Sequence, residues 1–202
     1  AYAMRTCLVG SEMCIRDRVV VVGGGVIGCS VAYHLTKFGW KDVVLLERDQ
    51  LTSGTTWHAA GLVSQLGPTA AVTKIRKYTL DLYKKLEKEV DHSAGLRING
   101  ALSIAQTDAR WQELQRQATT AQLYDVDIKI LDKDQIKKNY PIMHTKDLKG
   151  GVLMPGDGAA DPSGVTHMLA KGARLGGAKI FEQSPVETLS LIHISEPTRQ
   201  VL

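Results

Sequence analysis

The stretch VVVVGGGVIGC, from Val19 to Cys29, decides the fold of this chain of 202 residues. A run of valines is typical of a strand that is buried on both faces. Three glycines follow, and the residues from Val26 to Phe38 predict a helix with apolar side chains on most sides, which we expect to be well buried. A second apolar run at Val43–Leu46 predicts another strand. The chain therefore opens with a β-α-β unit, which indicates an α/β fold.

The glycines between the first strand and the first helix form a nucleotide-binding pattern. Gly23, Gly25 and Gly28 match G-x-G-x-x-G, and Glu47 ends the second strand, nineteen residues after Gly28. In a dinucleotide fingerprint the glycines allow a tight turn, close approach of the backbone to a pyrophosphate, and close helix–strand packing. The acid accepts hydrogen bonds from the adenosine ribose and disfavours a 2′-phosphate. The pattern therefore favours FAD or NAD over NADP.

Later parts of the chain alternate between predicted helices and strands. We expect a long amphipathic helix over Pro68–His92, with Ile75 on its buried stripe. Asp161 and Pro162 are typical of the N-cap and first residue of a helix, which should run to Leu175. Further strands are expected at Gly100–Ala105, Val126–Leu131, Gly151–Met154 and Ala178–Glu182, and further helices at Asp108–Tyr124 and just before Tyr140.

These elements predict a doubly wound, Rossmann-like domain. Ala178–Glu182 should be the third parallel strand of the first sheet. Residues from about 65 to 155 should form an inserted α+β segment within that domain.

The composition is that of an ordinary globular chain, with 44% hydrophobic and 23% charged residues. The formal net charge of +4 arises from basic residues mixed with acidic ones, which is typical of solvated helix faces rather than of a nucleic-acid-binding surface. No apolar run approaches the roughly 20 residues that span a bilayer, and the histidines lack metal-ligand spacing. We therefore expect no nucleic acid, membrane or metal among the partners.

The two ends of the chain are related in an unusual way. Cys7–Arg18 reads CLVGSEMCIRDR and Leu189–Gln200 reads LSLIHISEPTRQ. Codons permitted for the first peptide, read on the opposite DNA strand, encode the second, and the segment is similar to a transposon-type sequencing adapter. We therefore interpret residues 1–18 and 189–202 as non-native flanks of a truncated protein. Cys29 is then the one native cysteine, which fits a reducing compartment.

Three segments carry a resemblance to a known family. GGGVIGCSVAYHL, VVLLERDQLTSGTTWHAAGL and GDGAADPSGVTHMLAKGA resemble the N-terminal FAD-binding region of the dimethylglycine and sarcosine dehydrogenases, which are D-amino-acid-oxidase-like flavoproteins. The resemblance covers essentially all of residues 19–188 and implies a FAD-dependent oxidoreductase domain there. The residues expected to contact FAD are Gly23, Gly25, Val26, Ile27, Gly28, Glu47, Arg48, Gly54, Thr55, Thr56, Trp57, His58, Ala59, Ala60, Gly61, Leu62 and Val186.

The segment TTWH at Thr55–His58 is the most specific part of the resemblance. In those dehydrogenases the histidine of this motif is joined covalently to the 8α-methyl group of FAD, and His58 stands at its position. A neutral imidazole is a good nucleophile for a methyl carbon that the electron-poor flavin has activated. The alternative is that His58 packs near the flavin without a bond. We expect the covalent link.

The resemblance implies oxidative N-demethylation of dimethylglycine or sarcosine, with hydride transfer from the N-methyl carbon to FAD. It also implies an electron-transfer flavoprotein as the electron acceptor. A tetrahydrofolate-binding region and the catalytic residues would lie beyond this chain, so no catalytic residue is assigned within it. The implied location is the mitochondrial matrix in a eukaryote or the cytoplasm in a bacterium. Two alternatives stay open: FAD-dependent oxidation of another amine, and a non-catalytic role like that of the pyruvate dehydrogenase phosphatase regulatory subunit.

Overall fold

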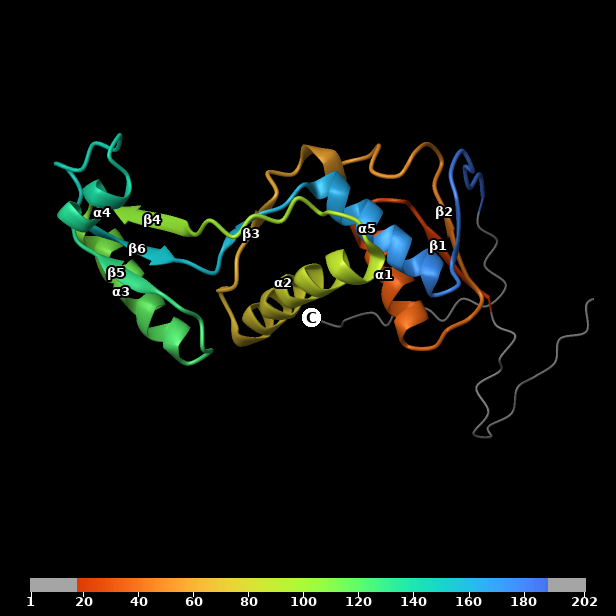
Figure 1. Cartoon of the computed structure of the whole chain (residues 1–202), viewed down its shortest axis with the longest axis horizontal. Helices are drawn as coiled ribbons and strands as arrows, with labels where there is room; N and C mark the ends of the chain where they lie inside the picture. Colours follow the sequence, from red (N-terminus) through yellow and green to blue (C-terminus); the bar gives the residue numbers. More distant parts are fainter. Residues whose placement is uncertain (1–17, 189–202) are drawn as a thin grey trace, which may run out of the picture.

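The computed structural model describes residues 18–188, which form an elongated molecule with two lobes (Figure 1). The expected non-native flanks lie outside the described residues, apart from Arg18. The exposed side chain of Arg18 forms an ion pair with Asp42, with 3.1 Å between Nε and Oδ2. Because both side chains are exposed to solvent, this ion pair contributes little to stability.

The first lobe is built on a parallel three-stranded sheet. Its elements are β1 (Val19–Val22), α1 (Val26–Lys37), β2 (Val43–Leu46), the 3-10 helix η1 (Thr56–His58), α2 (Ala70–Val90), α5 (Pro162–Leu175) and β8 (Lys179–Phe181). The strands lie in the order β1-β2-β8, and both pairs are parallel. The β-α-β opening and the third parallel strand predicted from the sequence are therefore confirmed.

The main core lies between one face of this sheet and the helices α1, α2 and α5. Leu45 on β2, Ala32 on α1 and Leu86 on α2 are at most 1% exposed, and they belong to one cluster with Met168 and Leu169 of α5. Burial of each large apolar side chain stabilises the fold by about 1.5–3 kcal/mol. Helix α5 is therefore the central helix of the lobe (Figure 1).

The opening strand and helix are less buried than the sequence predicts. Val20 and Val22 are 49% and 55% exposed on β1, which is an edge strand of the sheet, whereas Val44, the partner of Val20 on the central strand β2, is 8% exposed. On α1, Ile27 and Val31 are 78% and 44% exposed. These two side chains line an open cavity, which explains why a helix with apolar residues on most sides is not fully buried.

Helix α2 lies within the predicted insertion but packs in the core of the first lobe. Thr69 is its N-cap, and the Thr69 hydroxyl oxygen accepts a hydrogen bond from the Val72 backbone N–H. Leu82 and Val90 are buried against the main core, whereas Ile75 is 63% exposed, contrary to its place on the predicted stripe. Ile75 lies near the N-terminal end of α2, beyond the part of the helix that packs on α5.

The second lobe is a small antiparallel sheet with two helices. Its elements are β4 (Ala101–Ala105), α3 (Asp108–Gln122), β5 (Lys129–Leu131), α4 (Lys133–Asn139) and β6 (Gly150–Met154). The strand order is β4-β6-β5, and α3 packs on the sheet through Leu114 and Ala118. Only the residues from β4 to β6 of the predicted insertion make up this lobe, and the strands and helices predicted there are present.

A short antiparallel pair that the sequence did not predict connects the lobes. It consists of β3 (Leu62–Val63) and β7 (Gly158–Ala159). Helix α5 begins two residues beyond Ala160, where Asp161 Oδ2 accepts a hydrogen bond from the Gly164 backbone N–H at 2.7 Å and Pro162 occupies the first turn. The predicted start of this helix is therefore confirmed.

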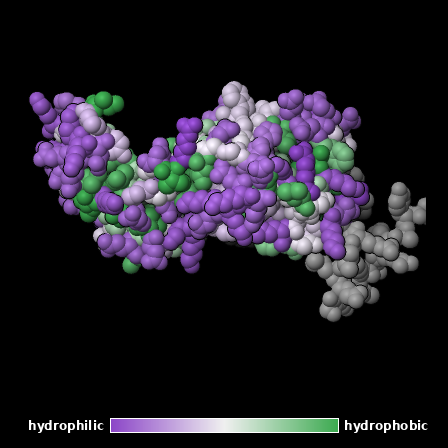
Figure 2. All heavy atoms as spheres, viewed as in Figure 1, coloured by the Kyte–Doolittle hydropathy of each residue, from purple (hydrophilic) through white to green (hydrophobic). Residues whose placement is uncertain are grey.

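The visible surface in Figure 2 is mostly hydrophilic, with hydrophobic residues exposed in separate patches. Among residues 18–188, no helix is long and apolar enough to cross a membrane. The same residues contain no group of three His, Cys, Asp or Glu side chains arranged to hold a metal ion.

Candidate cofactor-binding site

The glycine-rich turn between β1 and α1 has a geometry that only glycine satisfies at two positions. Gly23 has a φ of +108°, and its backbone N–H donates to the Leu46 carbonyl oxygen at 2.8 Å. A Cβ atom on Gly28 would lie 1.9 Å from the Gly23 carbonyl oxygen. Helix α1 therefore starts in direct contact with the end of β1, as the fingerprint requires.

The N-terminus of α1 presents backbone donors to the outside of the molecule. The Val26 N–H is held by the Thr56 hydroxyl oxygen at 3.0 Å, so η1 is attached to the start of α1. The N–H groups of Ile27 and Gly28 lie in the first helical turn, where no intrahelical acceptor exists. Together with the helix dipole, these groups favour an anion such as a pyrophosphate.

Glu47 lies beside the same turn. Its Oε2 accepts a hydrogen bond from the Gly24 N–H at 2.5 Å, and its Oε1 accepts one from the Asp49 N–H at 3.0 Å. Burial opposes ionisation of Glu47, but the backbone donors of Asp49 and Gly24 and the nearby Arg48 outweigh it and lower the pKa of this carboxyl. An ionised Glu47 keeps further lone pairs with which to accept hydrogen bonds from ribose hydroxyls.

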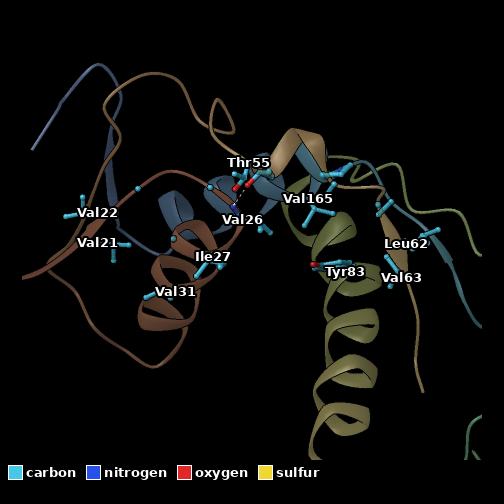
Figure 3. Close-up of a pocket in the computed structure, with 18 residues that line it drawn as sticks. Val21, Val22, Val26, Ile27, Val31, Thr55, Leu62, Val63, Tyr83 and Val165 are labelled. Atoms are coloured by element: carbon cyan, nitrogen blue, oxygen red, sulfur yellow. Dashed lines mark hydrogen bonds between the residues drawn. The ribbon is translucent and has the colours of Figure 1, made fainter. Parts of the chain in front are cut away.

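Two cavities meet at the N-terminus of α1. The larger one has a volume of about 650 Å³, lies between α1 and α2, and has no charged residue in its lining (Figure 3). The smaller one has a volume of about 370 Å³ and is lined by Glu47 and Arg48. The residues that line both are Val22, Gly23, Gly25, Thr55 and Thr56. One elongated ligand can therefore lie across the glycine turn.

The structure brings most of the residues expected to contact FAD into these two cavities. The larger cavity is lined by Gly23, Gly25, Val26, Ile27, Gly28, Thr55, Thr56, Ala59, Gly61 and Leu62. The smaller cavity adds Glu47, Arg48, Gly54 and Val186. Trp57, His58 and Ala60 line neither cavity.

His58 is exposed on η1, and its ring packs on the Trp57 ring with 3.8 Å between centroids. Trp57 is itself 57% exposed. The two stacked rings therefore lie between Thr56 and Ala59 in the chain, and both of those residues line the larger cavity.

Several residues that line the larger cavity were not expected from the sequence. They are Val21, Val22, Val31, Val63, Tyr83, Ala160, Pro162 and Val165. Tyr83 extends from α2 toward the cavity (Figure 3). The pattern of apolar residues along α2 predicted only that Tyr83 packs in the core. Nothing in that local pattern indicates that α2 lies across the cavity from α1.

Two other chemically active side chains do not belong to the cavities. Burial raises the pKa of the Cys29 thiol to about 12, so Cys29 is a packed thiol in the first turn of α1. Asp157, 1% exposed, accepts hydrogen bonds from Gln65, and its Oδ2 has no partner among the described residues. Burial raises the pKa of Asp157, although the Gln65 donors and Arg76 act in the opposite direction.

The joined cavities fit a flavin dinucleotide. The smaller cavity offers the acid Glu47 for a ribose, and the glycine turn with the α1 N–H groups suits a pyrophosphate. The larger, apolar cavity has room for a flat aromatic ring system.

Residues 18–199 match the family described as FAD dependent oxidoreductase. The chain is 38% identical over 174 residues to human mitochondrial dimethylglycine dehydrogenase, covering 86% of this chain and 20% of that protein. It is 41% identical over 169 residues to human mitochondrial sarcosine dehydrogenase, covering 83% of this chain and 18% of that protein. It is also 33% identical over 169 residues to the mitochondrial pyruvate dehydrogenase phosphatase regulatory subunit of Mus musculus, covering 84% of this chain and 19% of that protein.

Among solved structures, L-proline dehydrogenase from P. horikoshii superimposes with a TM-score of 0.79 at 26% identity. The match covers 87% of this chain and 46% of that one. The chain thus spans about one fifth of the length of the curated relatives and under half of the solved structure.

Proposed function

The chain belongs to the family of FAD-dependent oxidoreductases, and we propose that it is part of an enzyme that oxidises a small N-methylated glycine. The observation that carries the proposal is the pair of adjoining cavities at the glycine turn, of which the smaller is lined by Glu47 and the larger by Tyr83. Their shape suits FAD, and the names of two relatives specify dimethylglycine and sarcosine as what those proteins dehydrogenate.

The residues of this chain bind and orient the cofactor. Glu47 accepts hydrogen bonds from the adenosine ribose, and the N–H groups at the start of α1 hold the pyrophosphate. Val26, Ile27 and Val165 exclude water from the ring system. When bound, FAD would supply the acceptor for a hydride, that is, the hydrogen together with the two electrons of the N-methyl C–H bond.

The proposal includes a covalent bond between His58 and FAD. It is supported by the TTWH segment and by the position of η1, whose Thr56 contacts the start of α1. His58 is exposed, and its chain neighbour Ala59 lines the larger cavity.

The partners of the whole protein are part of the same proposal. Electrons would pass to an electron-transfer flavoprotein, and a tetrahydrofolate-binding region would lie outside this chain. The mitochondrial relatives support the mitochondrial matrix as the location if the source is a eukaryote. We further propose that residues 1–18 and 189–202 are not native, and amplification of the gene from genomic DNA tests this directly.

A second candidate is a non-catalytic role, supported by the likeness to the phosphatase regulatory subunit. Such a protein would retain the cavity and bind FAD without being reduced by an amine.

The deciding experiment uses the full-length protein loaded with FAD. It is mixed without oxygen with dimethylglycine, sarcosine or glycine, and the visible absorbance of the oxidised flavin is followed. Rapid bleaching by a methylated glycine, but not by glycine, is the expected result. A flavin that stays oxidised with every amine would contradict the enzyme and favour the regulatory role.

A further inference from the structure

A polar bridge connects helix α1 to helix α2. His34 Nδ1 lies 2.7 Å from the Ser30 carbonyl oxygen, and His34 Nε2 lies 2.8 Å from the Tyr78 hydroxyl oxygen. Because a carbonyl oxygen only accepts, Nδ1 carries the proton of the neutral ring, and Nε2 accepts a hydrogen bond from the Tyr78 O–H. Lys37 Nζ donates to the same hydroxyl oxygen at 3.4 Å. The hydrogen bonds of the bridge therefore run in one direction, from Lys37 through Tyr78 to His34.

The bridge joins two helices that line the larger cavity from different sides. Val31 lines that cavity from α1, and Tyr83 lines it from α2 (Figure 3). Both helices pack on α5, and among residues 18–188 the hydrogen bonds between α1 and α2 are the two that Tyr78 forms. His34 lies about one helical turn beyond Val31, and Tyr78 lies about one and a half turns before Tyr83. The bridge is therefore placed to fix how far apart the two walls stand.

Lys37 brings a positive charge to the bridge. Burial opposes this charge, but the interactions with Tyr78 and Tyr33 outweigh burial and raise the pKa of Lys37. Its Nζ lies 5.6 Å from the centroid of each of these two rings, which is a cation–π arrangement. A second positive charge, on His34, would therefore meet the charge of Lys37 at a single phenol oxygen.

No acid among the described residues pairs with His34 or Lys37. The charged residues that α2 and α5 carry near the bridge are Lys74, Asp81, Lys171 and Arg174. Lys171 donates to the Asp91 carbonyl oxygen, and Arg174 pairs with Glu182. A charge on His34 is therefore not compensated by an ion pair.

We propose that the hydrogen bond from Tyr78 to the neutral ring of His34 positions α2 against α1 and thereby sets the width of the cavity that takes the flavin. The inference rests on the proposed function only in placing FAD in that cavity. Protonation of His34 removes the lone pair that accepts from Tyr78, and the new Nε2–H must share the phenol oxygen with Lys37. The bridge therefore opens as the pH falls through the range in which imidazoles ordinarily take up a proton, and FAD binds less tightly. His34 and Tyr78 are positioning residues of the cofactor site.

The test uses the full-length protein with His58→Ala as the background, so that FAD affinity can be measured whether or not the wild type holds FAD covalently. The apoprotein is titrated with FAD at about pH 8 and about pH 5.5, on either side of the ordinary imidazole pKa, and quenching of flavin fluorescence is followed. Tyr78→Phe and His34→Leu should each weaken FAD binding at the higher pH by roughly 3- to 10-fold, the range of one hydrogen bond. The loss of affinity on acidification should be larger by a similar factor in the background than in either variant.

Two further variants separate the hydrogen bond from other effects of substitution. His34→Gln supplies an amide oxygen that accepts from Tyr78, so it should recover the affinity at both pH values. His144→Leu removes an exposed histidine of the second lobe and should behave like the background. The double variant with Tyr78→Phe and His34→Leu should bind FAD about as tightly as either single variant, because both changes remove the same bond.

Urea unfolding of each apoprotein distinguishes positioning of the cavity from a general contribution to folding. A loss of stability without a change in FAD affinity, an equal pH dependence in Tyr78→Phe and the background, or a failure of His34→Gln to recover affinity would overturn the proposal. These measurements need no amine, so a protein that oxidises none of the amines would defeat the proposed function and leave this test intact. A background protein that binds no FAD at either pH would overturn both.

Discussion

Glu47 Oε2 lies 2.5 Å from the backbone nitrogen of Gly24, so the acid at the end of β2 is bonded to the glycine turn at the end of β1. This bond lies beside Gly23 and Gly25, which line both cavities. The carboxylate thus stabilises the turn and faces the smaller cavity at the same time.

Glu47→Gln should weaken FAD loading by roughly 10-fold or more, because charge-assisted hydrogen bonds become neutral ones. The pKa of Glu47 is lowered, so its stabilising contribution is present above the ordinary carboxyl pKa of 4.5 and is lost as the pH falls through the lower, folded value. A titration of apoprotein with FAD at neutral pH checks the effect. Glu89→Gln, on the exposed side of α2, serves as the control, and equal affinities for both variants would remove Glu47 from the site.

Gly28→Ala should destabilise the protein by about 1–3 kcal/mol or more, because the new Cβ would meet the Gly23 carbonyl oxygen and push α1 away from β1. Gly54 is a matched control, since a Cβ there meets nothing within 4 Å. Urea unfolding of the apoproteins compares the two. A Gly28→Ala variant as stable as Gly54→Ala would contradict the contact between helix and strand.

His58→Ala should abolish covalent retention of flavin. The wild-type full-length protein is expected to keep its yellow colour after acid precipitation, whereas the variant should release FAD into the supernatant. The variant should still bind FAD through the pyrophosphate and ribose contacts and turn over more slowly, because an unlinked flavin has a lower reduction potential. Flavin found wholly in the acid supernatant of loaded wild-type protein would leave His58 as a surface partner of Trp57.

Asp157→Asn should change the pH dependence of stability. Burial raises the pKa of Asp157 above 3.8, so the folded state holds this proton more tightly than the unfolded state does. Ionisation therefore costs stability as the pH rises through the folded pKa. Asn keeps the oxygen that accepts from the Gln65 N–H, so the variant should gain stability relative to wild type as the pH rises above the ordinary carboxyl pKa of 3.8. Thermal unfolding across this range, with the exposed Asp127→Asn as the control, measures it; parallel curves for all three proteins would contradict the prediction.

The sequence by itself determined the elements whose signals are local. The valine run and glycine turn defined β1 and the start of α1, and the Asp161-Pro162 pair defined the start of α5, because strand burial, turn geometry and helix capping depend on residues a few positions apart. The fingerprint also identified Gly28 and Glu47, whose contacts in the structure explain why those residue types are needed.

Only the tertiary structure decided what depends on distant contacts. The Gln65–Asp157 bond joins residues 92 positions apart, the β3–β7 pair joins residues still farther apart, and no local pattern specifies such a pairing. The same holds for α2, which the chain order placed in an insertion but which packs on α5 and brings Tyr83 to the larger cavity. A stripe of apolar residues on a helix shows that one face is buried, but it does not show which segment covers that face. The exposure of Ile27 and the position of Tyr83 were therefore decided by packing between segments far apart in the chain.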